Sequence, residues 1–270
     1  MSKTILLIHG AWLNAASWAG FKARYEAKGY TVLAPNWPHD DRSPAELRAS
    51  PHPGLARTGV RAILAHYEHI IRGLSEQPII IGHSAGAVFA QVLLDRGYGA
   101  AGVAIDPAVM QGAPLGPHAI VSALPALTAW AGWRRALHMS RKFFSARFAQ
   151  TLPSDQQNAA YDLYIVPTAG RVYWSGIFDH AAKVRWANPD RAPLLLVGGG
   201  KDLIADASMT KGIYKRQKRA GSLTELKIYP DRSHFTCLEP GWEEVADYAL
   251  GWAARHARDT HATRRLAWAA

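Results

Sequence analysis

The sequence predicts an α/β fold, in which a mostly parallel sheet carries helices on both faces and an inserted helical lid interrupts the core. Short aliphatic runs alternate with segments of helical spacing over most of the 270 residues. This alternation stops at about residue 112, where the chain becomes irregular and aromatic, and it returns after Pro193. We therefore predict a core formed by residues 1–111 and 186–257, a lid over residues 112–185, and a basic C-terminal tail over residues 258–270.

The first part of the core contains four aliphatic runs that end near glycine or proline, as buried strands do. The helical segments between them carry apolar residues at intervals of three and four, as in Val60, Ile63, Leu64 and Tyr67. Residues 39–56 are rich in Asp, Pro, Arg and Ser and are predicted to form a loop. The predicted strands are 4–8, 31–34, 78–81 and 102–105, and the predicted helices are 22–29, 57–74 and 85–95.

The same rhythm in the last part of the chain predicts strands at 194–197 and 224–229 and helices at 206–220 and 242–257. The predicted lid is dense in aromatic side chains, which are suited either to a small separate core or to an apolar substrate pocket. The residues that we expect to line such a pocket are Trp12, Trp130, Phe144, Tyr173 and Trp174.

Composition excludes several classes of protein. The 31 Lys and Arg exceed the 21 Asp and Glu and give a net charge of +10, but the basic residues are scattered and do not alternate with aromatics. We therefore expect no nucleic-acid partner. The single cysteine, Cys237, rules out an intrachain disulfide. No apolar run has the length of a secretory signal or of a membrane span, so we expect a cytoplasmic protein of undetermined oligomeric state.

Residues 78–87, PIIIGHSAGA, contain the pattern G-x-S-x-G around Ser84. The pattern follows a predicted buried strand and opens a predicted helix, which is the context that a nucleophile elbow requires. Such a turn holds the serine in a strained conformation with its hydroxyl exposed above the sheet. The helix that follows contributes a partial positive charge beneath a developing anion. We predict that Ser84 is a nucleophile.

A serine hydroxyl needs a base to take its proton and an acid to orient that base. Asp202 and His234 each follow a predicted strand, so both should lie at the sheet edge that carries Ser84. We predict Asp202 as the acid and His234 as the base. Rival candidates are the acids Asp206 and Asp106 and the bases His180 and His256.

Two further motifs are rejected on context. Residues 97–102 match G-x-G-x-x-G, but they follow a helix and precede a strand, whereas a dinucleotide site has the opposite order. His66 and His69 lie three residues apart on a predicted helix without further ligands, so we expect no metal site there. We predict neither a metal nor an organic cofactor.

The segments HGAW, GHSAG, GGGKD and DRSHF, in this order, resemble the α/β-hydrolase superfamily over nearly the whole chain. More narrowly, the sequence resembles small bacterial serine esterases, among them serine-dependent N-acyl-homoserine lactonases. This resemblance implies the α/β-hydrolase fold, with Ser84 as nucleophile, Asp202 as acid and His234 as base, in agreement with the assignments made from the residues.

We therefore expect a carboxylic ester hydrolase that acts on a small-molecule ester or lactone through an acyl-enzyme. The backbone N–H groups of Ala11 and Ala85 should form the oxyanion hole, with Trp12 as a second candidate for the place of Ala11. We expect His9 to hold its loop by a hydrogen bond and not to act as a base. The functions that stay open besides hydrolysis are a perhydrolase or acyltransferase with the same triad, a C–C hydrolase, and a receptor that keeps the hydrolase scaffold.

Overall fold

The computed structural model describes residues 2–258 and contains a six-stranded sheet in the order β2-β1-β3-β4-β7-β8. Every neighbouring pair in this sheet is parallel. The predicted fold class is therefore confirmed. The strands are β1 (Thr4–Ile8), β2 (Thr31–Leu33), β3 (Ile79–His83), β4 (Ala101–Ile105), β7 (Leu194–Gly199) and β8 (Thr224–Tyr229).

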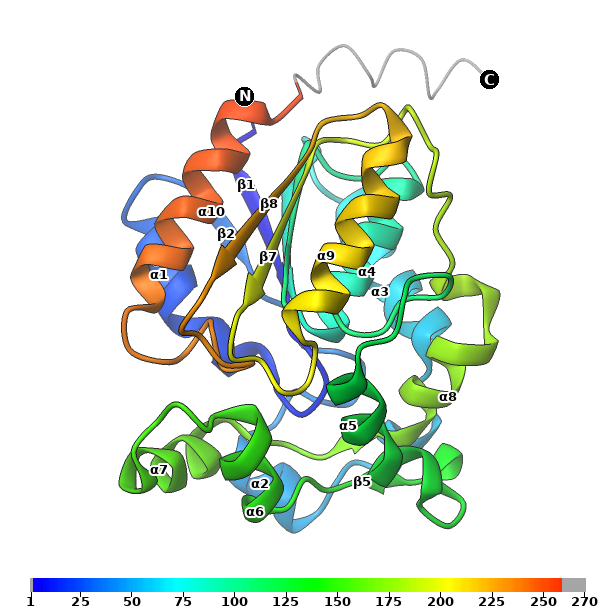
Figure 1. Ribbon diagram of the computed structural model, residues 1–270, viewed down its shortest axis with the longest axis vertical. Helices are drawn as coiled ribbons and strands as arrows, with labels where there is room; N and C mark the ends of the chain where they lie inside the picture. Colours follow the sequence, from blue (N-terminus) through cyan, green and yellow to red (C-terminus); the bar gives the residue numbers. More distant parts are fainter. Residues whose placement is uncertain (1, 259–270) are drawn as a thin grey trace.

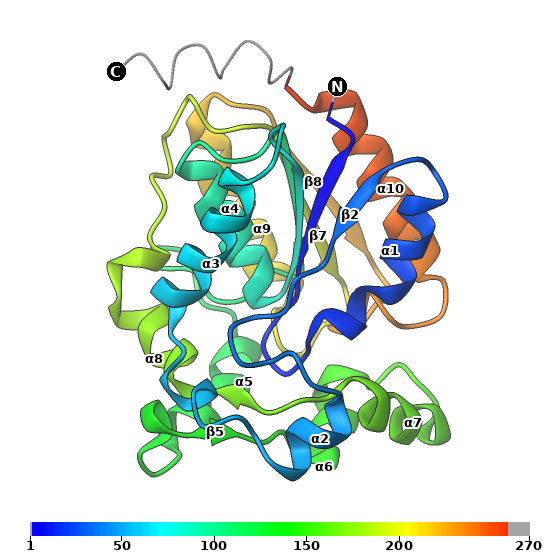
Figure 2. The ribbon, with the colours of Figure 1, turned by 180° about the vertical axis from the view of Figure 1, so that it is seen from behind.

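Helices cover both faces of the sheet (Figures 1 and 2). One face carries α3 (Val60–Arg72), α4 (Ala85–Asp95) and α9 (Ala207–Gln217), and the other carries α1 (Ala19–Glu26) and α10 (Trp242–His256). Successive strand residues point to opposite faces. In β1, Leu6 and Ile8 join the core beneath the first group of helices, while Ile5 and Leu7 join the core beneath the second.

The segment between β4 and β7 leaves the sheet, and its helices α5, α6 and α7 lie beyond the carboxyl ends of the strands, at the bottom of Figures 1 and 2. Its own core joins Phe144 and Phe148 to Leu13 and Phe235 of the sheet domain. We propose that this segment is a lid, with the boundaries expected from the sequence. Its elements are α5 (Pro117–Thr128), β5 (Ala136–Leu137), α6 (Arg141–Phe143), α7 (Ser154–Tyr164), β6 (Thr168–Ala169) and α8 (Gly170–Phe178).

The loop expected over residues 39–56 is wrong in part, because α2 (Pro44–Ala49) lies within it. The Ser43 side chain accepts from the backbone of Glu46, and the Glu46 side chain accepts from the backbone of Ser43. This capping box, with Pro44 in the first turn and Leu47 buried, outweighs the polar composition of the stretch.

The remaining predicted elements are present, with ends that differ by up to about three residues, as is usual for sequence-based boundaries. Short single turns connect several of them. Of the predicted tail, only Arg258 lies within the described residues. Among residues 2–258, no helix combines the length and the apolar character that crossing a membrane requires.

Candidate active site

The residues expected to carry the chemistry all follow strands at one edge of the sheet. Ala11 follows β1, Ser84 follows β3, Asp202 follows β7 and His234 follows β8. Strands β1 and β3 are neighbours in the sheet, but the chain passes from β1 to β2 on one side and from β3 to β4 on the other. The strand order therefore switches between β1 and β3. Crevices at such a switch point are where open parallel sheets bind ligands.

Ser84 has φ 55° and ψ −119°, a conformation that is strained for any residue with a side chain. Neighbouring backbone holds this turn, because the Ser84 N–H donates to the Ile105 carbonyl at 2.9 Å. Gly86 makes the turn possible, since a Cβ at this position would lie 2.1 Å from the Ile8 carbonyl oxygen. The glycine of the pattern thus lets α4 begin directly against the end of β1.

His234 contacts both Ser84 and Asp202. Its Nε2 lies 2.9 Å from the Ser84 Oγ, and its Nδ1 lies 2.7 Å from the Asp202 Oδ2. With a proton on Nδ1 donated to Asp202, Nε2 is free to accept the serine proton. The second Asp202 oxygen accepts from the backbone N–H groups of Ile204 and Ala205 at 2.6 and 2.8 Å, so the carboxylate is fixed in orientation.

The His234 imidazole is completely buried. Burial by itself lowers its pKa, but the charge and hydrogen bond of Asp202 raise the pKa above its ordinary value. The ring of Phe148, from the inserted segment, packs edge-on against the imidazole with centroids 4.8 Å apart. The inserted segment thus shields the histidine from water.

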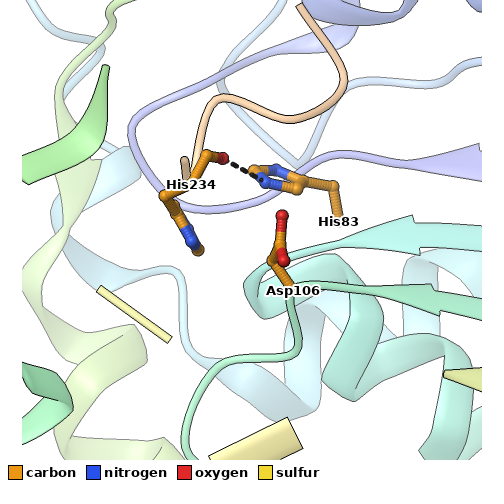
Figure 3. A group of neighbouring side chains, drawn as sticks. All are labelled: His83, Asp106 and His234. Atoms are coloured by element: carbon orange, nitrogen blue, oxygen red, sulfur yellow. Dashed lines mark hydrogen bonds between the residues drawn. The ribbon is translucent and has the colours of Figure 1, made fainter. Parts of the chain in front are cut away.

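His83, directly before Ser84, supports His234 through the backbone, and sequence reasoning missed this role. Its Nε2 donates to the His234 carbonyl at 2.9 Å (Figure 3). Burial and the neighbouring His234 hold the pKa of His83 well below its usual range, so its ring is neutral. The only signal in the sequence was the position of His83 directly before Ser84, at the end of a strand. The structure shows that this end of β3 faces the loop after β8.

Asp106, which also follows a strand at this edge, lies beside His83 and His234 (Figure 3). Its Oδ1 accepts from the Gly199 N–H at 2.6 Å, and no bond joins it to His234 among the described residues. Burial, followed by the charge of Asp202, raises the pKa of Asp106 to about 8. The structure therefore places Asp202, and not Asp106, against the histidine.

His83, Asp106 and His234 also form the one group in residues 2–258 whose potential ligand atoms lie close enough together for a metal, all within 4.8 Å. Both ring nitrogens of His234 already face Ser84 and Asp202, so His234 has no nitrogen left for a metal.

Asp206, His180 and His256, the rival acid and bases named from the sequence, have different surroundings. Asp206 caps α9, and its Oδ1 accepts from the Met209 N–H at 3.2 Å. His180 is exposed at the start of a short turn, and His256 packs against Trp252 near the end of α10.

The loop after β1 approaches Ser84 closely. A Cβ at Gly10 would lie 2.7 Å from the Ser84 Cβ, so only glycine fits there. His9 fixes the loop: its Nδ1 donates to the Gly10 carbonyl at 3.0 Å, and its Nε2 accepts from the Trp37 N–H at 3.1 Å. Burial lowers the pKa of His9 to about 4, which keeps the ring neutral in this structural role.

A cavity of about 690 Å³ opens above Ser84 and His234 between the sheet edge and the inserted segment. Its walls are mostly aliphatic and aromatic, and Ala11 and Ala85 line it beside Ser84. Two of the five predicted pocket residues, Trp12 and Tyr173, line this cavity.

The remaining three predicted pocket residues do not line the cavity. Phe144 is completely buried against Phe148 in the core of the inserted segment. Trp174 packs against Trp133 and the exposed Phe178, and Trp130 is 85% exposed on the surface. Aromatic content indicated that the segment packs, but it could not distinguish a wall of the cavity from a separate core or from the outer surface.

Comparison with known proteins agrees with the fold. A family model described as alpha/beta hydrolase family matches residues 5–248. No curated protein sequence gives a significant match.

Several solved structures are similar over nearly their whole length. A monoacylglycerol lipase of Paleococcus ferrophilus has 20% identity and a TM-score of 0.68, with 94% of this chain and 95% of that chain covered. A methylesterase from Arabidopsis has 13% identity and a TM-score of 0.69, with coverage of 93% and 98%. Methylketone synthase I from tomato has 13% identity and a TM-score of 0.68, with coverage of 95% and 99%. At these identities the likeness concerns the fold.

Proposed function

Because the chain belongs to the alpha/beta hydrolase family, we propose that it hydrolyses carboxylic esters of apolar acyl groups through a serine nucleophile. The observation that carries the proposal is the continuous line of contacts from Ser84 through His234 to Asp202 at the floor of an apolar cavity. A buried serine, histidine and carboxylate in this order are suited to acyl transfer.

In the proposed acylation step, the Ser84 Oγ attacks the ester carbonyl and its proton passes to the Nε2 of His234. Asp202 stabilises the imidazolium that forms and keeps Nδ1 protonated. The backbone N–H groups of Ala11 and Ala85 stabilise the oxyanion, and donors of this kind each contribute about 3 kcal/mol to the stabilisation of the transition state. The imidazolium then donates this proton to the alkoxide oxygen of the leaving group as the bond between that oxygen and the acyl carbon breaks.

Deacylation repeats these steps with water in the place of the alcohol. His234 removes a proton from the water, whose oxygen attacks the acyl-enzyme carbonyl, and the proton then passes to Ser84 as the acid product leaves. A lactone follows the same course, except that its alcohol stays attached to the acyl group. The proposed substrates therefore include lactones, N-acyl-homoserine lactones among them, as well as open esters.

The cavity supports an apolar acyl group, because its walls are mostly aliphatic and aromatic side chains. A volume of about 690 Å³ has room for an extended acyl chain as well as for the reacting ester. We propose that kcat/KM rises with acyl length until the cavity is filled, since each buried methylene contributes about 0.8 kcal/mol.

The test is a series of p-nitrophenyl esters and acyl lactones of graded chain length, measured with the wild type, with Ser84→Ala and with the control Ser145→Ala. We expect sustained turnover by the wild type and the control, and loss of at least about a thousandfold in Ser84→Ala with its fold intact. Binding without repeated turnover would instead indicate a receptor. Turnover by Ser84→Ala at the wild-type rate would disprove the serine mechanism.

A further inference from the structure

Exposed apolar side chains gather on one part of the inserted segment. Of the eleven large apolar side chains that are exposed among residues 2–258, nine lie in α5, in α8, in the loop before α5 or in the turn after it. We call these nine residues the apolar patch. They are Val109, Leu115, Ile120, Val121, Leu124, Trp130, Trp133, Ile177 and Phe178.

The patch is continuous with the rim of the cavity. Five of its members are both exposed to solvent and part of the cavity wall, so they form an apolar path from the surface inward. Those five are Val109, Leu115, Ile120, Leu124 and Ile177. An acyl chain that enters along this path contacts aliphatic side chains at the rim of the cavity that contains Ser84.

The charge around the patch is positive. No acidic residue occurs between Asp106 and Asp155, whereas five basic residues do. Arg134 and Arg135 are exposed directly after Trp133, and the Arg135 guanidinium donates to the Trp130 carbonyl at 3.4 Å. The five basic residues are Arg134, Arg135, Arg141, Lys142 and Arg147. Arg141 is paired with Asp162 and Arg147 donates to the carbonyls of His118 and Leu203, so Arg134 and Arg135 are the exposed charges next to the tryptophans.

Two acidic residues lie beside the patch. Asp206 lies against Gly116, next to Leu115, but it is buried and accepts from the Met209 N–H. The other is at the end of α8. Asp179 follows Phe178, and it is neutralised by an ion pair with Arg61 at 2.8 Å. The patch therefore presents exposed tryptophan and aliphatic side chains flanked by arginine, with no unpaired carboxylate next to Phe178. This combination is suited to the boundary between lipid headgroups and acyl chains.

We propose that the apolar patch docks on an anionic lipid surface, so that substrate passes from the lipid into the cavity along the apolar rim. Anionic headgroups complement Arg134 and Arg135, and Trp130 inserts at the level of the headgroups. A second copy of this chain is the rival occupant. Charge disfavours it, because a symmetric contact would bring the same arginines of two copies together.

Docking is tested by co-sedimentation with vesicles, using Ser84→Ala as the parent so that no lipid is hydrolysed. The vesicles contain phosphatidylcholine alone or equal parts of phosphatidylcholine and phosphatidylglycerol. We expect the parent to prefer the anionic vesicles, and Arg134→Glu with Arg135→Glu to weaken that binding by at least about tenfold. Trp130→Ala should weaken binding to both kinds of vesicle by about fivefold or more.

The matched control reverses two exposed charges at the carboxyl end of α9, Lys218→Glu with Arg219→Glu. It should bind like the parent, because the carboxyl end of α9 lies at the opposite end of the sheet from the inserted segment (Figure 1). With Ser84 restored, the Trp130 and arginine variants should hydrolyse a short soluble ester like the wild type.

Three results would overturn the proposal. They are no binding of the parent to anionic vesicles, an equal loss of binding in the α9 control, or a dimer in light scattering that Trp130→Ala dissociates. The proposal rests on the proposed function for the identity of the substrate, but vesicle binding does not require turnover. Failure of hydrolysis and failure of docking are therefore seen in separate measurements.

Discussion

The indole N–H of Trp12 donates to the phenol oxygen of Tyr173 at 2.7 Å, and this bond joins the loop after β1 to α8 of the inserted segment. The carbonyl of Trp12 also accepts from the N–H of Val166 at 3.0 Å, so the inserted segment holds Trp12 at two points. Trp12 has φ 69°, a strained conformation for a bulky residue. We infer that these contacts keep the adjacent Ala11 N–H directed at the site above Ser84.

Tyr173→Phe removes the acceptor of this bond and leaves the Trp12 indole without it. We expect kcat to fall by about tenfold while KM for a short ester stays near the wild-type value, because a loosened oxyanion donor weakens the transition state more than the ground state. Steady-state kinetics on a short p-nitrophenyl ester measure the two constants separately.

A suitable control is Tyr161→Phe, since Tyr161 lies in the same segment and its hydroxyl donates to the Met139 carbonyl at 2.5 Å without touching Trp12. It should lower Tm without a selective effect on kcat. If Tyr173→Phe changed only KM for long acyl chains, then Tyr173 would serve as cavity wall alone.

Gly10→Ala should disturb the same loop from its other end. The added methyl group would lie 2.7 Å from the Ser84 Cβ and 3.3 Å from its Oγ, so the loop and the nucleophile must separate. We expect a loss of about a hundredfold in kcat/KM, the usual effect of a displacement near 1 Å. The control is Gly73→Ala at the end of α3, where the nearest atom would be 3.4 Å away. Equal activity of both variants would contradict the close approach.

Much of the site could be predicted because the fold rule is simple. In a parallel sheet, the residues that follow the strands share one edge, so Ser84, Asp202 and His234 could be placed near one another from strand ends alone. The sequence favoured Asp202, with Asp206 and Asp106 as rivals, but it could not show which carboxylate contacts the histidine, because Asp202 and Asp106 both follow strands at that edge. Which carboxylate reaches the histidine depends on how each loop turns, and the sequence pattern does not determine that.

The inserted segment was harder to predict, because its helices pack irregularly and no period separates its inner from its outer side chains. Phe148 contacts His234 but was not singled out, whereas Trp130 was expected in the pocket and lies on the surface. The role of His83 also escaped prediction, since it acts on the backbone of a residue 151 positions away.

The pH dependence of kcat/KM should report the pKa of His234, which must be neutral to accept the serine proton. Activity should therefore rise with pH through a midpoint above about 6.5, the ordinary histidine value, because Asp202 raises this pKa despite burial. Asp202→Asn removes that attraction while burial persists, so the midpoint should move to lower pH. The maximal rate should also fall by roughly a thousandfold or more, as the tautomer is no longer fixed. A midpoint that did not move would mean that Asp202 does not raise the pKa of His234.

Asp106→Asn tests whether the second carboxylate at this edge takes part. With a pKa raised to about 8, Asp106 holds a proton at neutral pH, and asparagine preserves the oxygen that accepts from Gly199. We expect kcat/KM within about threefold of the wild type at pH 7. A loss as large as that of Asp202→Asn would show that Asp106 takes part in catalysis as well. Thermal denaturation of both variants separates this outcome from unfolding.

Asp40, in the loop after β2, should make the stability of the fold depend on pH. Its side chain is buried, and its Oδ1 has no hydrogen-bond partner among the described residues. Burial, followed by the charge of Asp41, raises the pKa of Asp40 to about 8 from an ordinary value near 4.

A carboxyl group whose pKa is raised in the folded state binds its proton more tightly there than in the unfolded chain. Its contribution to stability is therefore fully present below its ordinary pKa, and it is lost as pH rises through the folded-state pKa. Asp40→Asn is neutral at every pH and should escape the loss. The Tm of this variant relative to the wild type should therefore rise between pH 5 and pH 9, by at least about 3 °C for a chain of this size. The exposed Asp155→Asn should show no such trend, and a flat difference for Asp40→Asn would mean that Asp40 is ionised in the folded protein at both pH values.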